Sequence, residues 1–274
     1  CALPLAAAGC ATDPAAEIVG PTPRLQLLGE VHDNAEGHRR RLQLIRGHVA
    51  AGGRPVIAME QFDRERQPDL DAAMARCADA ACVIAAAAPA RAGWQWDHYA
   101  PVIQLALDHD LVLLAANLSR EAASKVVGGG FAAALSPGLI EEYALDQPLP
   151  AALLSAQVEA VRDGHCGMLP EAMLEPMARA QIARDVVMAD VMRDALAATD
   201  ERVLLLAGNG HVDRGIAVPW WLRASGEPVL AVGYLERGTD ADAGNRFDVV
   251  HLVPPAERED PCAAFSTPAR PAAP

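Results

Sequence analysis

Short runs of apolar residues alternate along the chain with longer segments in which apolar residues recur every three or four positions. Six runs have the length and composition of buried strands: residues 24–29, 55–60, 111–116, 202–207, 228–234 and 247–253. Helical periodicity is found between them, in residues 34–51, 68–88, 99–109, 119–127 and 211–224. Strands without a polar face, separated by helices, are typical of parallel sheets. The pattern predicts an α/β fold with a largely parallel β-sheet flanked by helices.

A long helical block interrupts this alternation. Residues 136–198 are almost wholly helical in pattern, and the run Glu171–Ala198 predicts the longest helix. We expect this block to form a smaller helical subdomain over one end of the sheet, within a domain of residues 24–260. Residues 261–274 are rich in Pro and Ala and predict a loose tail.

Composition narrows the classes of function. The chain has 274 residues, of which 51% are apolar but 4% aromatic, and its formal net charge is −13. Apolar content this high excludes a disordered chain. Acidity with no basic cluster beyond Arg39-Arg40-Arg41 argues against nucleic acid as a partner, and the acidity also argues against docking on anionic lipid by charge. The sequence contains no run of about 20 apolar residues, so it predicts no membrane-spanning helix.

The first residues and the cysteines indicate export. Residues 1–23 have the pattern of a signal-peptide remnant followed by a tether, with three prolines after residue 10. The segment Ala7-Ala8-Gly9-Cys10 resembles a bacterial lipobox, which predicts a lipid on Cys10 and a periplasmic or outer-membrane lipoprotein; ordinary cleavage near Ala8 is the alternative. Four cysteines remain in the body, which suits an oxidising compartment. Cys77 and Cys82 are close enough in sequence to bridge, whereas Cys166 and Cys262 have no obvious partners.

Polar residues collect where the predicted strands end. Glu30 and His32 follow the first strand, Glu60 ends the second, Asn117 follows the third, and His211 follows the fourth. In open α/β sheets, ligands bind in the crevice at the carboxyl ends of the strands. We therefore expect these side chains to share one pocket.

Two of these histidines stand in a G-x-x-H pattern, at Gly29 and Gly208. A neutral imidazole near a helix N-terminus can ligate a metal. His32, Glu60 and His211 are therefore candidate ligands of a divalent metal in a two-histidine, one-carboxylate site. The alternative is that each histidine hydrogen-bonds a loop carbonyl.

A second group of residues suits haem. His165 and Met168, just before the longest helix, are possible axial ligands, as are the phenolates of Tyr99 and Tyr143. Met173 adds to a methionine-rich surface that can accommodate a flat cofactor, although methionines also fill gaps between helices. Arg184 is a candidate clamp for a propionate, or else part of a solvated pair with its neighbour.

Together these segments resemble a known family, the ChaN-like haem-binding lipoproteins, related to the Tiki/TraB proteins and the erythromycin esterases. The segments that carry the resemblance are residues 28–34, 59–61, 93–99, 117–120, 165–167, 180–185 and 208–212. The resemblance implies a parallel sheet with a smaller helical domain, outer-membrane tethering and a role in haem or iron acquisition. It also implies stacked haems at a homodimer interface and an uptake receptor as partner, but it does not single out the axial ligand.

The Tiki side of the resemblance implies a different chemistry, a metal-dependent hydrolase of peptide or ester bonds. Glu30, His32, Glu60 and His211 would then be the catalytic group, with Glu30 or Asp33 as base toward metal-bound water. The sequence contains no G-x-S-x-G elbow, so it does not indicate a serine hydrolase. It also has no G-x-G-x-x-G after the first strand, so it does not support a dinucleotide site. A non-catalytic envelope protein with a vestigial cleft is the third interpretation, so the sequence leaves enzymatic activity open.

Overall fold

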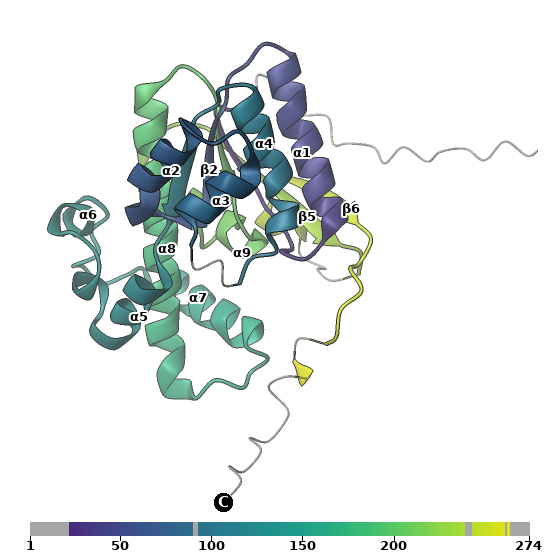
Figure 1. The fold of residues 1–274 in the computed structure, drawn as a ribbon. Coiled ribbons are helices and arrows are strands. Elements are labelled where there is room, and N and C mark those ends of the chain that lie inside the picture. The colour runs from purple at the N-terminus through teal and green to yellow at the C-terminus, as the bar shows by residue number, and fades with distance from the viewer. Residues whose placement is uncertain (1–21, 90–92, 239–242, 261, 264–274) are drawn as a thin grey trace, which may run out of the picture.

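A parallel sheet lies at the centre of the fold (Figure 1). In the computed structural model its strands are β1 (Leu25–Leu28), β2 (Val56–Asp63), β3 (Leu113–Asn117), β4 (Val203–Leu206), β5 (Val229–Glu236) and β6 (Val249–Val253). Their spatial order is β3-β2-β4-β1-β5-β6, and every neighbouring pair is parallel. The predicted α/β class and the parallel sheet are confirmed.

The structure describes residues 22–89, 93–238, 243–260 and 262–263. The predicted signal-peptide remnant with Cys10 lies outside these residues, apart from the end of its tether. The predicted loose tail also lies outside them, except for residues 262–263. In the described part of the chain, no helix has the length and apolarity that crossing a membrane requires.

Helices cover both faces of the sheet and extend beyond one end. They are α1 (Ala35–Ala50), α2 (Gln67–Met74), α3 (Ala80–Ala87), α4 (Ala100–Asp108), α5 (Arg120–Gly129), α6 (Pro137–Glu142), α7 (Ala151–Gly164), α8 (Glu171–Ala198), α9 (Asn209–Val212), α10 (Val218–Leu222) and α11 (Ala243–Arg246). Helix α1 starts where Asn34 accepts a hydrogen bond from the Gly37 amide, as a good N-cap residue does.

Alternation along the strands divides the core into two layers. Leu28 and Ile57 face the helices α1 to α4, which lie in front of the sheet in Figure 1. Leu27 and Ala58 face the other side, where they pack against α8 and α10. Because both faces are covered, the strands are apolar at most positions, with exceptions such as the buried Gln26 of β1.

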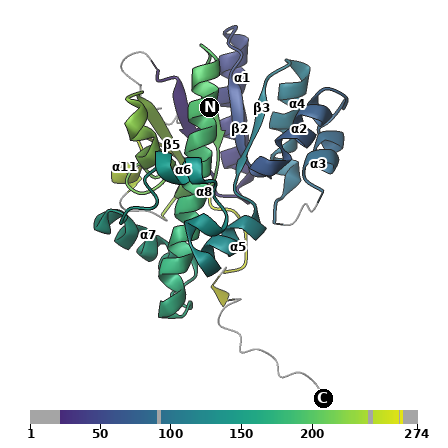
Figure 2. The same ribbon diagram turned by 90° about the vertical axis from the view of Figure 1, so that its left-hand side faces the viewer.

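Helix α8 joins the sheet to the helical block that the sequence predicts. Its second half, with Met188 and Met192, packs on the sheet. Its first half, with Ile182, packs against α5 and Phe131, and α7 lies alongside it. Figures 1 and 2 show this block extending below the sheet. Helix α5 precedes the predicted range of 136–198, so the helical cluster begins earlier in the chain than expected.

The predicted helix over residues 211–224 is wrong in one respect, since two short helices, α9 and α10, replace it. Between them the chain turns at Asp213, whose carboxylate accepts a hydrogen bond from the Gly215 amide at 2.7 Å. Pro219 then stands in the first turn of α10, where its missing N–H does no harm. Periodicity continued across the turn and hid the break.

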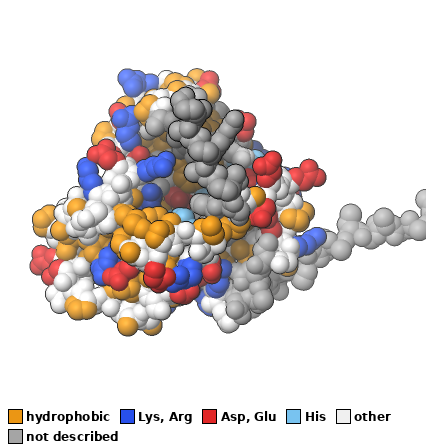
Figure 3. Space-filling view, turned by 90° about the horizontal axis from the view of Figure 1, so that it is seen from below, with side chains coloured by type: hydrophobic (Ala, Val, Ile, Leu, Met, Phe, Trp, Pro, Cys, Tyr) orange, Lys and Arg blue, Asp and Glu red, His pale blue; other side chains and the backbone are white. Residues whose placement is uncertain are grey.

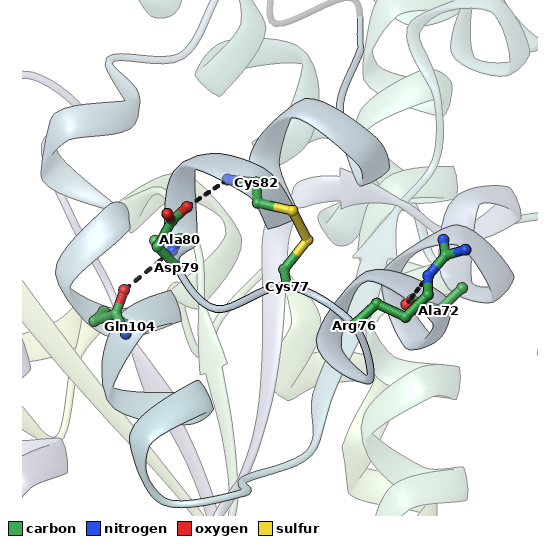
Figure 4. The surroundings of a disulfide bond; sticks show 7 residues. All are labelled: Ala72, Arg76, Cys77, Asp79, Ala80, Cys82 and Gln104. Carbon is green, nitrogen blue, oxygen red and sulfur yellow. Dashed lines mark hydrogen bonds between the residues drawn. A yellow bond between two sulfur atoms is a disulfide. The ribbon is translucent and has the colours of Figure 1, made fainter.

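Two disulfides close loops of very different length. Cys77–Cys82 joins the end of α2 to the start of α3, where Asp79 caps the helix by accepting from the Cys82 amide (Figure 4). Cys166–Cys262 joins the turn between α7 and α8 to the C-terminal segment, across 96 positions of sequence. The sequence offered no partner for Cys166, because only the fold brings these two cysteines together.

The C-terminal segment is also held by an ion-pair cluster. The guanidinium of Arg258 donates to both carboxylate oxygens of Asp33, at 2.6 and 2.7 Å, and to Glu236. Asn34 donates to the Pro254 carbonyl at 2.8 Å. Residues 254–260 therefore run from β6 past the loop after β1, and Cys262 is linked to the helical block.

The two disulfides should contribute unequally to stability, because a cross-link restricts the unfolded chain more when it closes a longer loop. With separations of 96 and 5 residues, the Cys166→Ser/Cys262→Ser variant should lose about 2.5 kcal/mol more unfolding free energy than Cys77→Ser/Cys82→Ser. Urea unfolding followed by circular dichroism measures both. Equal losses would contradict the assignment of Cys166–Cys262 as the long-range link.

Candidate functional site

The register of the sheet brings three polar strand ends side by side. Leu28 of β1 is paired with Leu206 of β4, which is paired in turn with Met59 of β2. The residues after these positions lie at one edge, where the strands reach their carboxyl ends. Glu30, Glu60 and the glycine-rich turn after β4 therefore meet, as the sequence predicts for a site of this fold.

Glu30 is the buried centre of a polar network and is 3% exposed. One carboxylate oxygen accepts a hydrogen bond from the Tyr99 hydroxyl at 2.5 Å and lies 2.7 Å from Nδ1 of His32. The other oxygen forms an ion pair with the guanidinium of Arg41, which is itself buried. Side chains from the loop after β1, from α1 and from the start of α4 thus converge on one carboxylate.

The charges of this network follow from its burial and its pairing. Burial raises the pKa of Glu30, but Arg41 and the His32 hydrogen bond outweigh it and hold that pKa at about 2. Burial lowers the pKa of His32, but the Glu30 hydrogen bond outweighs it and the net shift is upward. Burial and then Glu30 raise the pKa of Tyr99, so its phenol stays neutral and donates. Glu30 is therefore anionic, and His32 donates to it through Nδ1.

His38 supports the loop that carries His32. Burial, with Arg41 beside it, lowers the pKa of His38 to about 4, so its ring is neutral. Arg41 donates to Nδ1 of this ring at 3.0 Å, which leaves the proton on Nε2. Nε2 lies 3.0 Å from the His32 carbonyl oxygen and donates to it. One arginine on α1 thus holds both the carboxylate and the backbone of the site.

Gly208 is required by the close packing of the site. A Cβ atom at this position would lie 2.9 Å from Cε1 and 3.1 Å from Nε2 of His32. The amide of Gly208 also donates to Oε2 of Glu60 at 2.7 Å. The glycine lets the imidazole and the carboxylate approach the same turn.

His211 is held between two carboxylates. Its Nδ1 lies 2.6 Å from Asp185 of α8, and its Nε2 lies 3.5 Å from Oε1 of Glu60. Burial lowers the pKa of His211, but Glu60 and Asp185 outweigh it and the net shift is upward. Gln157 also donates to Asp185, at 3.2 Å. The pair fixes the orientation of the imidazole and keeps a proton available on it.

A cavity of about 570 Å³ opens beside His32. Its apolar wall includes Trp94 and Trp96, and Trp94 meets the His32 ring edge-on with centroids 5.0 Å apart. Its polar lining includes Gln61, Asp63, Asn117, Arg66, Arg120 and Arg184. Figure 3, which views this edge of the sheet from below, shows a hollow with a histidine side chain in it and hydrophobic side chains beside it.

Most residues that the sequence assigns to the strand ends are brought together. Glu30, His32, Glu60 and His211 form one chain of contacts through the turn at Gly208. Arg184 reaches the same edge, where Nη1 donates to Asn117 at 2.7 Å and to the Leu118 carbonyl at 2.8 Å, and it lines the cavity. Tyr99 also belongs here, but it is fully buried behind His32.

The other predicted haem contacts lie away from this cavity. Tyr143, at the end of α6, packs against Trp221 and beneath the guanidinium of Arg193. His165 ends α7, and its Nδ1 lies 2.8 Å from the Val161 carbonyl oxygen. Met168 and Met173 are 56% and 38% exposed at the start of α8. None of these four side chains lines the cavity beside His32.

The expected divalent-metal site is not supported. Within the described ranges, no three His, Cys, Asp or Glu side chains are grouped so that they could hold a metal ion. In this structure one polar atom of each predicted ligand is engaged by a protein partner. His32 binds Glu30, Glu60 accepts from the Gly208 amide, and His211 binds Asp185.

Some residues of the site were missed from the sequence. Arg41 and His38 were not assigned to the site, and Asp185 was considered only as half of a solvated pair with Arg184. The sequence held one signal of their burial, since His38 and Arg41 share a helical face with the apolar Leu42 and Ile45. In the structure all four are buried. Gln61 lies in the segment 59–61 that carries the family resemblance, but no role in the site was assigned to it from the sequence.

Comparison with known proteins shows which family and which solved structures this chain is similar to. A family described as "Haem-binding uptake, Tiki superfamily, ChaN" matches residues 23–222. The solved structure titled "Cofacial heme binding to ChaN of Campylobacter jejuni" is 21% identical, with a TM-score of 0.65, and the match covers 83% of this chain and 86% of that one. An erythromycin esterase in its open conformation is 15% identical, with a TM-score of 0.46 and coverage of 89% and 79%. No curated protein matches the chain.

Glu30 should make the free energy of unfolding depend on pH in the acidic range. Its pKa is about 2 in the fold against an ordinary 4.5, so its stabilising effect is present above about pH 4.5 and is lost as the pH falls toward 2. Between pH 6 and pH 3, the wild-type protein should lose on the order of 2 kcal/mol more unfolding free energy than Glu30→Gln. Denaturant unfolding across this range measures the difference, and parallel curves would refute it.

Proposed function

Because the chain belongs to the ChaN family of haem-binding uptake proteins in the Tiki superfamily, we propose that it binds haem without a covalent bond, as cargo for uptake, in the cavity beside His32. The observation that carries the proposal is the composition of that cavity. It combines an aromatic wall, an oriented imidazole and three arginines at one edge of the sheet. Its volume, about 570 Å³, is within the range of roughly 300–1,000 Å³ typical of ligand sites.

The wall of the cavity suits a flat apolar ring. Trp94 and Trp96 both pack against Tyr99, with ring centroids 5.7 and 6.0 Å away, so the indoles are held by a buried residue. Ala87 and Ala88 add small side chains to the lining. Rigid aromatic groups with small neighbours leave room for a planar ligand and bury its surface.

His32 is the residue we assign to the haem iron. Its side chain is 52% exposed and lines the cavity. Nδ1 is bound to Glu30, so Nε2 is the nitrogen that remains for a metal. A ligating histidine commonly donates its other N–H to a carboxylate, which fixes the ring and strengthens its donor nitrogen. Tyr99, the other nearby candidate, is fully buried and donates to the same carboxylate.

Arginines in the lining suit the acidic edge of haem. Arg66, Arg120 and Arg184 face the cavity with one acidic residue, Asp63, among the lining side chains. This local excess of positive charge contrasts with the net charge of −13 of the chain. A guanidinium can bind a carboxylate through two parallel hydrogen bonds.

We further propose that the protein works in the cell envelope as a lipoprotein, anchored through Cys10. The lipobox-like segment supports the anchor, and the Cys77–Cys82 and Cys166–Cys262 disulfides support an oxidising compartment. A homodimer and an uptake receptor are proposals that rest on the family alone. Sedimentation with and without haemin tests the dimer.

A haemin titration tests the site. The wild-type protein should give a saturable Soret shift, and His32→Ala should weaken haemin binding by at least tenfold and change the position of the band, because the axial nitrogen is lost. His109→Ala is the matched control, since His109 is exposed at the end of α4, outside the cavity lining. Absence of any saturable shift at micromolar haemin would refute haem binding. An unchanged spectrum of His32→Ala would refute the axial assignment.

A further inference from the structure

Gln61 is a buried amide without a partner. It lies near the end of β2, between Glu60 and Phe62, and is 4% exposed. Neither Nε2 nor Oε1 has a hydrogen-bond partner among the residues that the structure describes. An unpaired buried polar group destabilises a fold, and native proteins hold few of them. The position of Gln61 in the lining of the cavity points to a partner that arrives with a ligand.

A second donor in the same lining is also unpaired. The indole Nε1 of Trp96 is buried and has no acceptor within the described ranges. Arg184 also lines the cavity, and its hydrogen bonds to Asn117 and to the Leu118 carbonyl both use Nη1. The remaining N–H groups of the guanidinium are not used in those contacts. Three residues that carry N–H donors thus line one cavity.

Donors in excess identify the class of group that would bind. The lining holds three arginines against one aspartate, so the ligand group should be an anion. An amide N–H, an indole N–H and a guanidinium suit a carboxylate, which accepts several hydrogen bonds at once. The Gln61 oxygen can accept from an arginine of the lining or from water brought in with the ligand.

We propose that Gln61, Trp96 and Arg184 form a carboxylate-binding floor of the cavity, which orients an aromatic acid by its carboxylate. This inference rests on the proposed function and deepens it, because for haem the bound group is a propionate. Gln61 acts as a specificity residue, while the aromatic wall binds the ring of any flat ligand.

Two pairs of probes separate the carboxylate from the rest of the ligand. The first pair is haemin and haemin dimethyl ester, which share the iron and the ring. The second pair is 1-pyrenebutyrate and its methyl ester, which contain no iron. Dissociation constants are measured by Soret absorbance for the first pair and by pyrene fluorescence for the second. The proteins are the wild type, Gln61→Leu and Gln95→Leu, whose Gln95 is an exposed glutamine outside the cavity lining.

The wild type should prefer each acid over its ester by at least tenfold. Gln61→Leu should lose about tenfold in affinity for the acids and should bind the esters as the wild type does, because one hydrogen bond to a charged group is removed. Gln95→Leu should behave as the wild type. The thermal midpoint of ligand-free Gln61→Leu should equal or exceed that of the wild type, since an unpaired amide is replaced by an apolar side chain.

Other outcomes overturn the inference in distinct ways. Equal binding of acid and ester by the wild type, or an unchanged preference in Gln61→Leu, refutes the carboxylate floor. A lowered thermal midpoint of ligand-free Gln61→Leu shows that the amide has a structural role instead. If haemin does not bind at all, the proposed function fails, and the pyrene pair then decides the carboxylate floor alone.

Discussion

The carboxylate of Glu30 is the constraint on which the site depends. A buried anion is tolerated only when its desolvation is offset by charge and hydrogen bonds, which Arg41, Tyr99 and His32 provide. Each partner comes from a different element, so the packing of α1, of the segment before α4 and of the loop after β1 is tied to one group. Because Glu30 cannot be left unpaired, the ring of His32 has little freedom to turn. The orientation of the one exposed imidazole in the cavity is therefore a consequence of buried electrostatics.

The sheet supplies the second half of the geometry. Parallel pairing of β1, β4 and β2 places their carboxyl ends in one row, and Gly208 allows two functional side chains to meet over one turn. On one side of this row, His211 is enclosed by Asp185 and Glu60. On the other side lies the cavity with its indoles and arginines. The same edge thus presents an enclosed imidazole and an accessible one, and only His32 lines the space that a large ligand can enter.

Much of this could be predicted from the sequence, and the exceptions share a physical cause. Apolar runs of strand length and helical periodicity are local properties, so the parallel sheet and the polar strand ends followed from them. The break in the helix before Pro219 is also a local feature, but we did not predict it because the periodic pattern continued across it. Arg41, Asp185 and the Cys166–Cys262 pair depend on contacts between distant segments, and a charged residue on an amphipathic helix is usually solvated. The proximity of His32, Glu60 and His211 was predicted correctly, whereas metal ligation by them is not supported within the described residues, because residue types do not show which way each side chain is turned.

The cavity also explains why the aromatic residues and the positive charges of this acidic, aromatic-poor chain are unevenly distributed. Trp94, Trp96 and Tyr99 stand within one short segment, and the arginines of the lining come from three elements around it. Packing alone does not require such a group, since it leaves Gln61 and the Trp96 indole, like a few other buried polar side chains of the described residues, without hydrogen-bond partners. A core optimised for stability would fill this space with aliphatic side chains. The retained polar atoms, next to a fixed imidazole, indicate a surface shaped for a ligand that has a flat apolar body and an acidic edge.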